Sequence, residues 1–103
     1  MDKIAGLKEI LQMDPKNSFA RYGLAMELAG CGETAAAVGE FDTLLENDPG
    51  YTPGYFMAAQ TLANAGRAAE AIERLKAGIT SAVRSGNTHA QSEMQAMLDE
   101  LNR

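Results

Sequence analysis

Reactive side chains are scarce in this sequence of 103 residues, which contains one histidine, His89, and one cysteine, Cys31. A metal site or an activated nucleophile needs several such groups to converge, and these two stand far apart in the chain. We expect His89 to be a solvated residue in the first turn of a helix rather than a base. We expect Cys31 to fill a small gap at a turn, as a free cysteine often does.

Other catalytic patterns are equally weak. The stretch GCGETAAAV contains Gly30 and Gly32 but nothing that completes a phosphate-binding loop, so these glycines are interpreted as turn formers. The fourteen Asp and Glu residues leave an acid–base pair open, although most of them lie on helix faces that we expect to be solvated. The sequence therefore predicts a protein that is not an enzyme and that has no metal site and no cofactor.

Composition restricts the kinds of partner. The net charge of −5 argues against nucleic acid and against anionic membranes, both of which require a basic face. No apolar run approaches the roughly 20 residues of a membrane span. The N-terminal stretch MDKIAGLKEILQM contains Lys3, Lys8 and Glu9, so it lacks the continuous apolar core of a secretion signal. Together with the single cysteine, these features predict one cytoplasmic domain without disulfides.

A period of about 34 residues runs through the chain. Asp14-Pro15 recurs as Asp48-Pro49, and apolar character persists at this shift where identity does not. The matched pairs include Leu11 with Leu45, Ala25 with Ala59, Leu28 with Leu62, Gly32 with Gly66, Ala37 with Ala71, and Phe41 with Leu75. A fixed period of this length predicts stacked similar units rather than one closed core.

Within each unit the apolar spacing is that of helices, and no period-two alternation suggests a strand. Gly-centred breaks divide each unit into two helices, and Asp-Pro steps end the second helix. The last helix is expected to begin with a capping box formed by Thr88 and Gln91. The expected helices span residues 2–13, 18–30, 34–47, 52–65, 68–84 and 89–101, and the apolar stripe of the fifth ends at Val83. Short loops require antiparallel neighbours.

The units resemble the tetratricopeptide repeat, a helix–turn–helix of about 34 residues. The first repeat reads Arg21-x2-Leu24-Ala25-x2-Leu28, then Ala37-x3-Phe41, then Pro49; the second reads Tyr55-x2-Ala58-Ala59-x2-Leu62, then Ala71-x3-Leu75. The resemblance implies an all-α, right-handed superhelical array of about six antiparallel helices. The divisions we expect within this single domain are a half-repeat helix in 1–15, repeats in 18–51 and 52–85, and a capping helix in 88–103. Arg21 departs from the family pattern, because it stands where an aromatic residue is usual.

The first helix of each repeat carries apolar residues beyond its packing face. In tetratricopeptide arrays the first helices line the inner, concave surface, so the resemblance implies that these residues face a groove. The candidate groove residues are Phe19, Tyr22, Met26, Phe56, Met57, Gln60 and Asn64. Aromatic rings and thioethers suit the binding of an apolar or amphipathic partner segment. The competing interpretation is that some of these rings only pack helix against helix between repeats.

The groove also departs from one known mode of the family, in which Lys, Arg and Asn hold the terminal carboxylate of a partner. Here only Gln60 and Asn64 offer neutral hydrogen bonds, so a carboxylate clamp is disfavoured. The sequence predicts a protein-interaction module that binds an unidentified protein or peptide. The alternative is a structural protein that forms a homodimer or larger homo-oligomer through Phe19, Met94 and Met97. A further open point is whether the last helix covers the end of the array or folds back over the groove.

Overall fold

Six α-helices make up nearly all of residues 2–103, the part of the chain that the computed structural model describes. They are α1 (Lys3–Met13), α2 (Ser18–Gly30), α3 (Thr34–Asn47), α4 (Thr52–Asn64), α5 (Ala68–Ser85) and α6 (Thr88–Leu101). No strand occurs in these residues. Each observed helix end lies within one residue of the end expected from the sequence, which is inside the usual uncertainty of such boundaries. The all-α prediction is confirmed.

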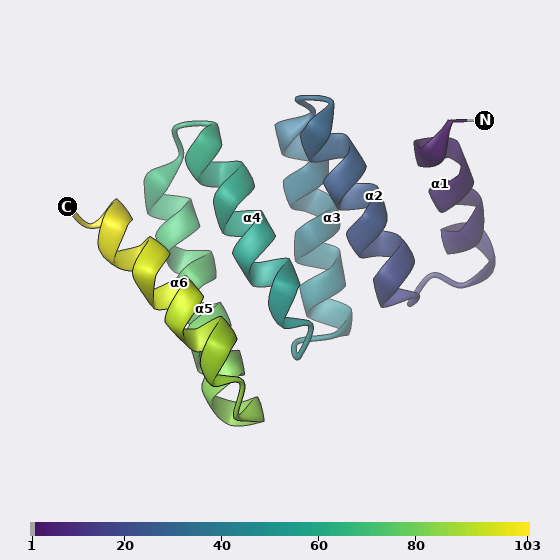
Figure 1. The fold of residues 1–103 in the computed structure, drawn as a ribbon. Coiled ribbons are helices and arrows are strands. Elements are labelled where there is room, and N and C mark those ends of the chain that lie inside the picture. Colours follow the sequence, from purple (N-terminus) through teal and green to yellow (C-terminus); the bar gives the residue numbers. More distant parts are fainter. Residues whose placement is uncertain (1) are drawn as a thin grey trace.

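The helices form a row, with each one packed against the next along the chain. In Figure 1, α2, α4 and α6 lie in one layer, α3 and α5 lie behind it, and α1 and α6 are at opposite ends of the row. The molecule is accordingly elongated, with extents of 41 × 29 × 18 Å. α6 packs against α5 and α4 and continues the row, so it does not fold back over α2. None of the helices in residues 2–103 has the length and apolarity needed to cross a membrane.

Small side chains allow the two layers to approach closely. Ala25, Ala37 and Ala58 are fully buried around Phe41, which is itself 0% exposed. The same close contact recurs at Gly78 of α5, where an added Cβ would lie 2.5 Å from Met94 Sδ. Burial of apolar surface is the main stabilising contribution in such a stack, because a single helix pair would leave its apolar face exposed to water.

The junction between α3 and α4 is held by hydrogen bonds from three helices. The carbonyl oxygen of Pro49 accepts a bond of 2.7 Å from Tyr55 Oη on α4 and one of 2.9 Å from Ser81 Oγ on α5. Ser18 Oγ at the start of α2 donates to Asp48 Oδ2 at 2.8 Å. Pro49 and Gly50 follow the end of α3, and these hydrogen bonds from α2, α4 and α5 fix the geometry of the junction.

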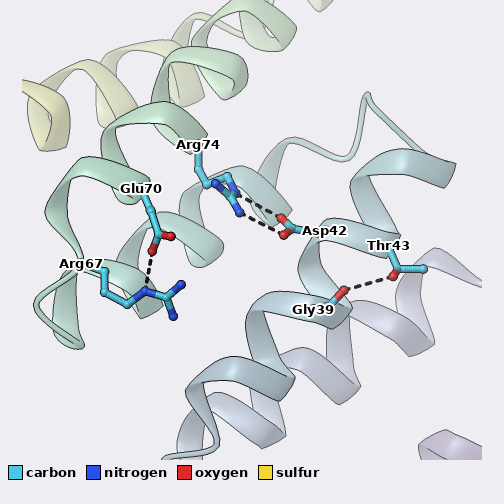
Figure 2. A network of polar contacts seen from close by, with 6 residues as sticks. All are labelled: Gly39, Asp42, Thr43, Arg67, Glu70 and Arg74. Atoms are coloured by element: carbon cyan, nitrogen blue, oxygen red, sulfur yellow. Dashed lines mark hydrogen bonds and ion pairs between the residues drawn. The ribbon is translucent and has the colours of Figure 1, made fainter.

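Ion pairs also connect helices of the row. Figure 2 shows Arg74 of α5 reaching Asp42 of α3, whereas Arg67, just before α5, bonds Glu70 in the first turn of that helix. Arg21, at the position where the family has an aromatic residue, pairs with Glu40 of α3. The departure at this position is therefore accommodated by a salt bridge between the two helices of one pair.

The structure corrects three local expectations. Cys31 is exposed on its turn and fills no gap. The N-cap of α6 is Asn87, whose side chain accepts from the Ala90 amide, so the expected capping box of Thr88 and Gln91 is wrong. Val83 is 55% exposed, so the buried face of α5 ends at Ala82 and does not include Val83.

Candidate partner-binding site

A hollow in the surface lies between α2, α4 and α6, the helices that share one layer in Figure 1. Its volume is about 260 Å³. The lining is predominantly apolar and consists of Tyr22, Thr52, Pro53, Phe56, Met57, Asn87, His89, Ala90, Glu93 and Met94. Each of the three helices contributes because α4 stands between the other two, so the hollow exists only in the stacked row.

Tyr22 forms the α2 side of the hollow and is held by two aromatic neighbours. Its ring lies 6.2 Å from that of Phe41 in an edge-on arrangement and 5.4 Å from that of Tyr51. Burial raises the pKa of Tyr22 above its ordinary value of 10.0, and the nearby Tyr51 raises it further. The phenol is therefore neutral near physiological pH, and this wall carries no charge.

Two methionines and a phenylalanine form the floor. Met94 of α6 is 1% exposed, whereas Phe56 and Met57 of α4 are only partly buried. Phe56 packs against the core cluster that contains Met94, and Met57 packs against the cluster around Phe41. The partly buried Met57 thioether and Phe56 ring present a surface that adjusts to the shape of an apolar ligand.

Charge is confined to one edge of the hollow, where α6 begins. Glu93 Oε1 lies 3.5 Å from Nε2 of His89, and these side chains are 54% and 86% exposed, respectively. The rest of the lining is neutral, because α4 contains no Asp, Glu, Lys or Arg and the α2 side is formed by Tyr22. No Lys or Arg is present among the lining residues.

Three of the residues predicted from the sequence meet in this hollow: Tyr22, Phe56 and Met57. Tyr22 and Phe56 also pack between helices, as the competing interpretation expected, so each ring belongs partly to the core and partly to the surface.

The other four predicted residues lie elsewhere. Phe19 is 78% exposed and does not line the hollow. Met26 packs against the core cluster around Phe41, and Gln60 is half-buried without lining the hollow. Asn64 is exposed at the end of α4, where it borders a separate depression.

The wall formed by α6 was not predicted, although the sequence contained a signal for it. Ala90 stands one repeat period after Phe56, and Met94 stands one repeat period after Gln60. Extending the period by one further unit would have identified the last helix as another inner helix. Met94 was instead expected to be exposed for self-association, and that expectation is wrong because it is almost fully buried.

Of the two reactive side chains noted in the sequence, His89 lines the hollow and Cys31 does not. His89 is solvated in the first turn of α6, as expected, and Cys31 lies on a distant turn. Within residues 2–103 no three His, Cys, Asp or Glu side chains are grouped in a way that would hold a metal ion.

Several known repeat proteins are similar to the chain. It is 28% identical to a TPR repeat-containing protein of Pseudomonas aeruginosa, over 97% of this chain and 95% of that protein. The solution structure of a tetratricopeptide repeat domain protein from Salinibacter ruber matches with 30% identity and a TM-score of 0.79, over 85% of this chain and 89% of the other. The TPR2B domain of yeast Sti1, solved as a complex with pHsp70, matches with 19% identity and a TM-score of 0.88, over 96% and 79%. No family model matches the chain.

The stacked helix pairs are typical of a helical-repeat protein, and these similarities identify the type of repeat. The chain belongs to the tetratricopeptide-repeat family, and its fold is the all-α superhelix of that family.

Proposed function

We propose that the protein is an interaction module whose hollow between α2, α4 and α6 binds an apolar or amphipathic segment of a partner protein. The observation that carries this proposal is the hollow itself, which is lined by partly exposed Tyr22, Phe56 and Met57. Aromatic and methionine side chains in a concave site are typical anchors for a peptide. The complex of the Sti1 domain with pHsp70 supports the same use of a closely similar fold.

We propose that the chain is divided as its sequence period suggests. Residues 18–51 and 52–85 are two repeats, residues 1–15 are a half-repeat, and residues 88–103 form a cap that also supplies one wall of the site. We further propose that the protein has no catalytic activity and acts in the cytoplasm, where a lone exposed cysteine stays reduced.

A selection of displayed random peptides tests the proposed site directly. The wild-type protein is expected to select binding peptides, and Ala90→Phe, which places a ring in the hollow without removing a core side chain, is expected to abolish their binding. Phe19→Ala is the matched control, because this exposed ring lies outside the hollow and its removal should leave binding unchanged. Binding that survives Ala90→Phe in a folded protein would refute the proposal.

Self-association is the second candidate, and exposed apolar residues at the α1 end of the row favour it. Met13 is 91% exposed, Phe19 is 78% exposed and Ile10 is 45% exposed. Sedimentation equilibrium at high protein concentration tests this function. A concentration-dependent dimer that Phe19→Ala and Met13→Ala weaken would support it, and a strictly monomeric protein would exclude it.

A further inference from the structure

We infer that the segment bound in the hollow is cationic: one large apolar side chain enters the hollow, and a Lys or Arg beside it pairs with Glu93. This inference rests on the proposed function and specifies the chemistry of the partner. Two properties of the site support it, namely the size of the hollow and the sign of the charge at its edge.

The size of the hollow limits what enters it. Its volume of about 260 Å³ lies below the roughly 300–1,000 Å³ of pockets that accept a drug-sized molecule. A space of this size, open to solvent and floored by Met57 and Met94, suits one bulky aliphatic or aromatic side chain that projects from a chain lying across the surface. The remainder of the segment must then lie along the rim.

The rim on the α6 side presents a carboxylate whose only ion-pair partner in the described chain is His89. An imidazole is not a permanent cation, whereas a Lys or Arg of the partner would be. The Glu93 side chain is 54% exposed, so it is accessible to a ligand, and it borders the hollow directly. A Lys or Arg beside the apolar side chain that enters the hollow would therefore meet the Glu93 carboxylate.

The charges around the hollow and on the whole protein also favour a cationic partner segment. No Lys or Arg lines the hollow to receive an acidic residue, and α4, which lies between α2 and α6, carries no charged side chain. The protein as a whole has a net charge of −5, which attracts cationic segments and repels anionic ones at long range. An acidic segment would meet repulsion from Glu93 at the rim and would find no Lys or Arg in the lining.

A charge reversal at the rim tests the inference. Displayed random peptides are selected in parallel against the wild type, Glu93→Lys and Asp99→Lys. The last variant makes the same change of charge on α6 but outside the hollow, where Asp99 accepts a hydrogen bond from Gln95. We expect wild-type and Asp99→Lys selections to share a large apolar residue flanked by Lys or Arg. Glu93→Lys should lose the basic residue and favour Asp or Glu in its place.

The affinity of one synthetic peptide from the wild-type selection then gives a quantitative check. Replacing its basic residue by Ala should weaken binding to the wild type about two- to fivefold, the range of an exposed ion pair, and should have no effect on binding to Glu93→Ala. Hollow-dependent peptides without a basic preference, or an unchanged preference in Glu93→Lys, would overturn this inference and leave the proposed function intact. Peptides whose binding is insensitive to Ala90→Phe would instead overturn the proposed function.

Discussion

Arg74 and Asp42 join two helices that are not consecutive in the chain. The guanidinium of Arg74 on α5 donates from Nε to Asp42 Oδ1 at 3.1 Å and from Nη2 to Asp42 Oδ2 at 3.0 Å. Figure 2 shows this two-point contact spanning from α5 to α3, the second helices of neighbouring pairs. It lies in the layer behind the candidate site, so it links adjacent pairs without occupying the binding surface.

A double-mutant cycle on Arg74→Ala and Asp42→Ala should give a modest coupling energy. The two side chains are 25% and 39% exposed, so solvent screens the pair, and we expect about 0.2–1 kcal/mol. The coupling should shrink in high salt. Urea unfolding of the four proteins at two salt concentrations measures it, and a coupling that is absent even at low salt would contradict the prediction.

Removal of the Phe41 ring should be far more costly. This side chain is 0% exposed and supports Tyr22 at the wall of the hollow. Phe41→Ala is therefore expected to lower the free energy of unfolding by about 3–5 kcal/mol. Phe19→Ala provides the control, because the loss of an exposed ring should change stability by no more than about 0.5 kcal/mol. Equal unfolding midpoints for the two variants would show that the core is assigned wrongly.

Two helical glycines should respond in opposite directions to the same substitution. Gly78→Ala would place a methyl group 2.5 Å from Met94 Sδ and 2.6 Å from Tyr55 Cβ, so we expect a loss of about 1–3 kcal/mol from overpacking. Gly39→Ala meets nothing within 4 Å and should gain about 0.5–1 kcal/mol, because alanine favours the helix. Thermal unfolding of both variants checks the pair, and a stabilised Gly78→Ala would mean that α4, α5 and α6 are packed less tightly.

The start of α6 provides a test of its cap. Asn87 Oδ1 accepts from the Ala90 amide at 3.1 Å, so Asn87→Ala should cost about 0.5–2 kcal/mol. No side-chain cap is formed by Thr88, and Thr88→Ala should be close to neutral. If chemical unfolding showed Thr88→Ala to be the less stable of the two variants, the capping box suggested by the sequence would be supported instead.

Alkaline pH should destabilise the fold through its tyrosines. Burial raises the pKa of Tyr22, with a further contribution from Tyr51, and burial followed by the charge of Asp48 raises the pKa of Tyr55. A raised pKa means that the folded state holds its proton more tightly than the unfolded state. The resulting stability is present below the ordinary pKa of 10.0 and is lost as pH rises through the higher folded value.

Unfolding free energies measured between neutral pH and the alkaline range should therefore fall, and Tyr22→Phe should reduce this dependence. The ultraviolet absorbance of tyrosinate gives a second readout, because Tyr22→Phe should lose part of the tyrosine ionisation that occurs above the ordinary pKa of 10.0. A wild-type protein whose stability is constant across this range would contradict the prediction.

The sequence alone determined the type and order of the elements. Helical apolar spacing, the breaks at Asp14-Pro15 and Asp48-Pro49, and the turn glycines predicted all six helices to within one residue at each end. These are local signals, because a helix depends on residues three and four positions apart and ends where proline or glycine interrupts it. The repeat period added the stacking of the pairs.

The tertiary structure decided where the hollow lies and which residues share it. Tyr22, Phe56 and Met94 stand on three separate helices and meet because the row brings α2, α4 and α6 into one layer. Phe19 and Met94 were both expected on the surface, yet one is 78% and the other 1% exposed. The difference depends on which neighbouring helix covers each side chain, a long-range property that spacing along one helix does not contain.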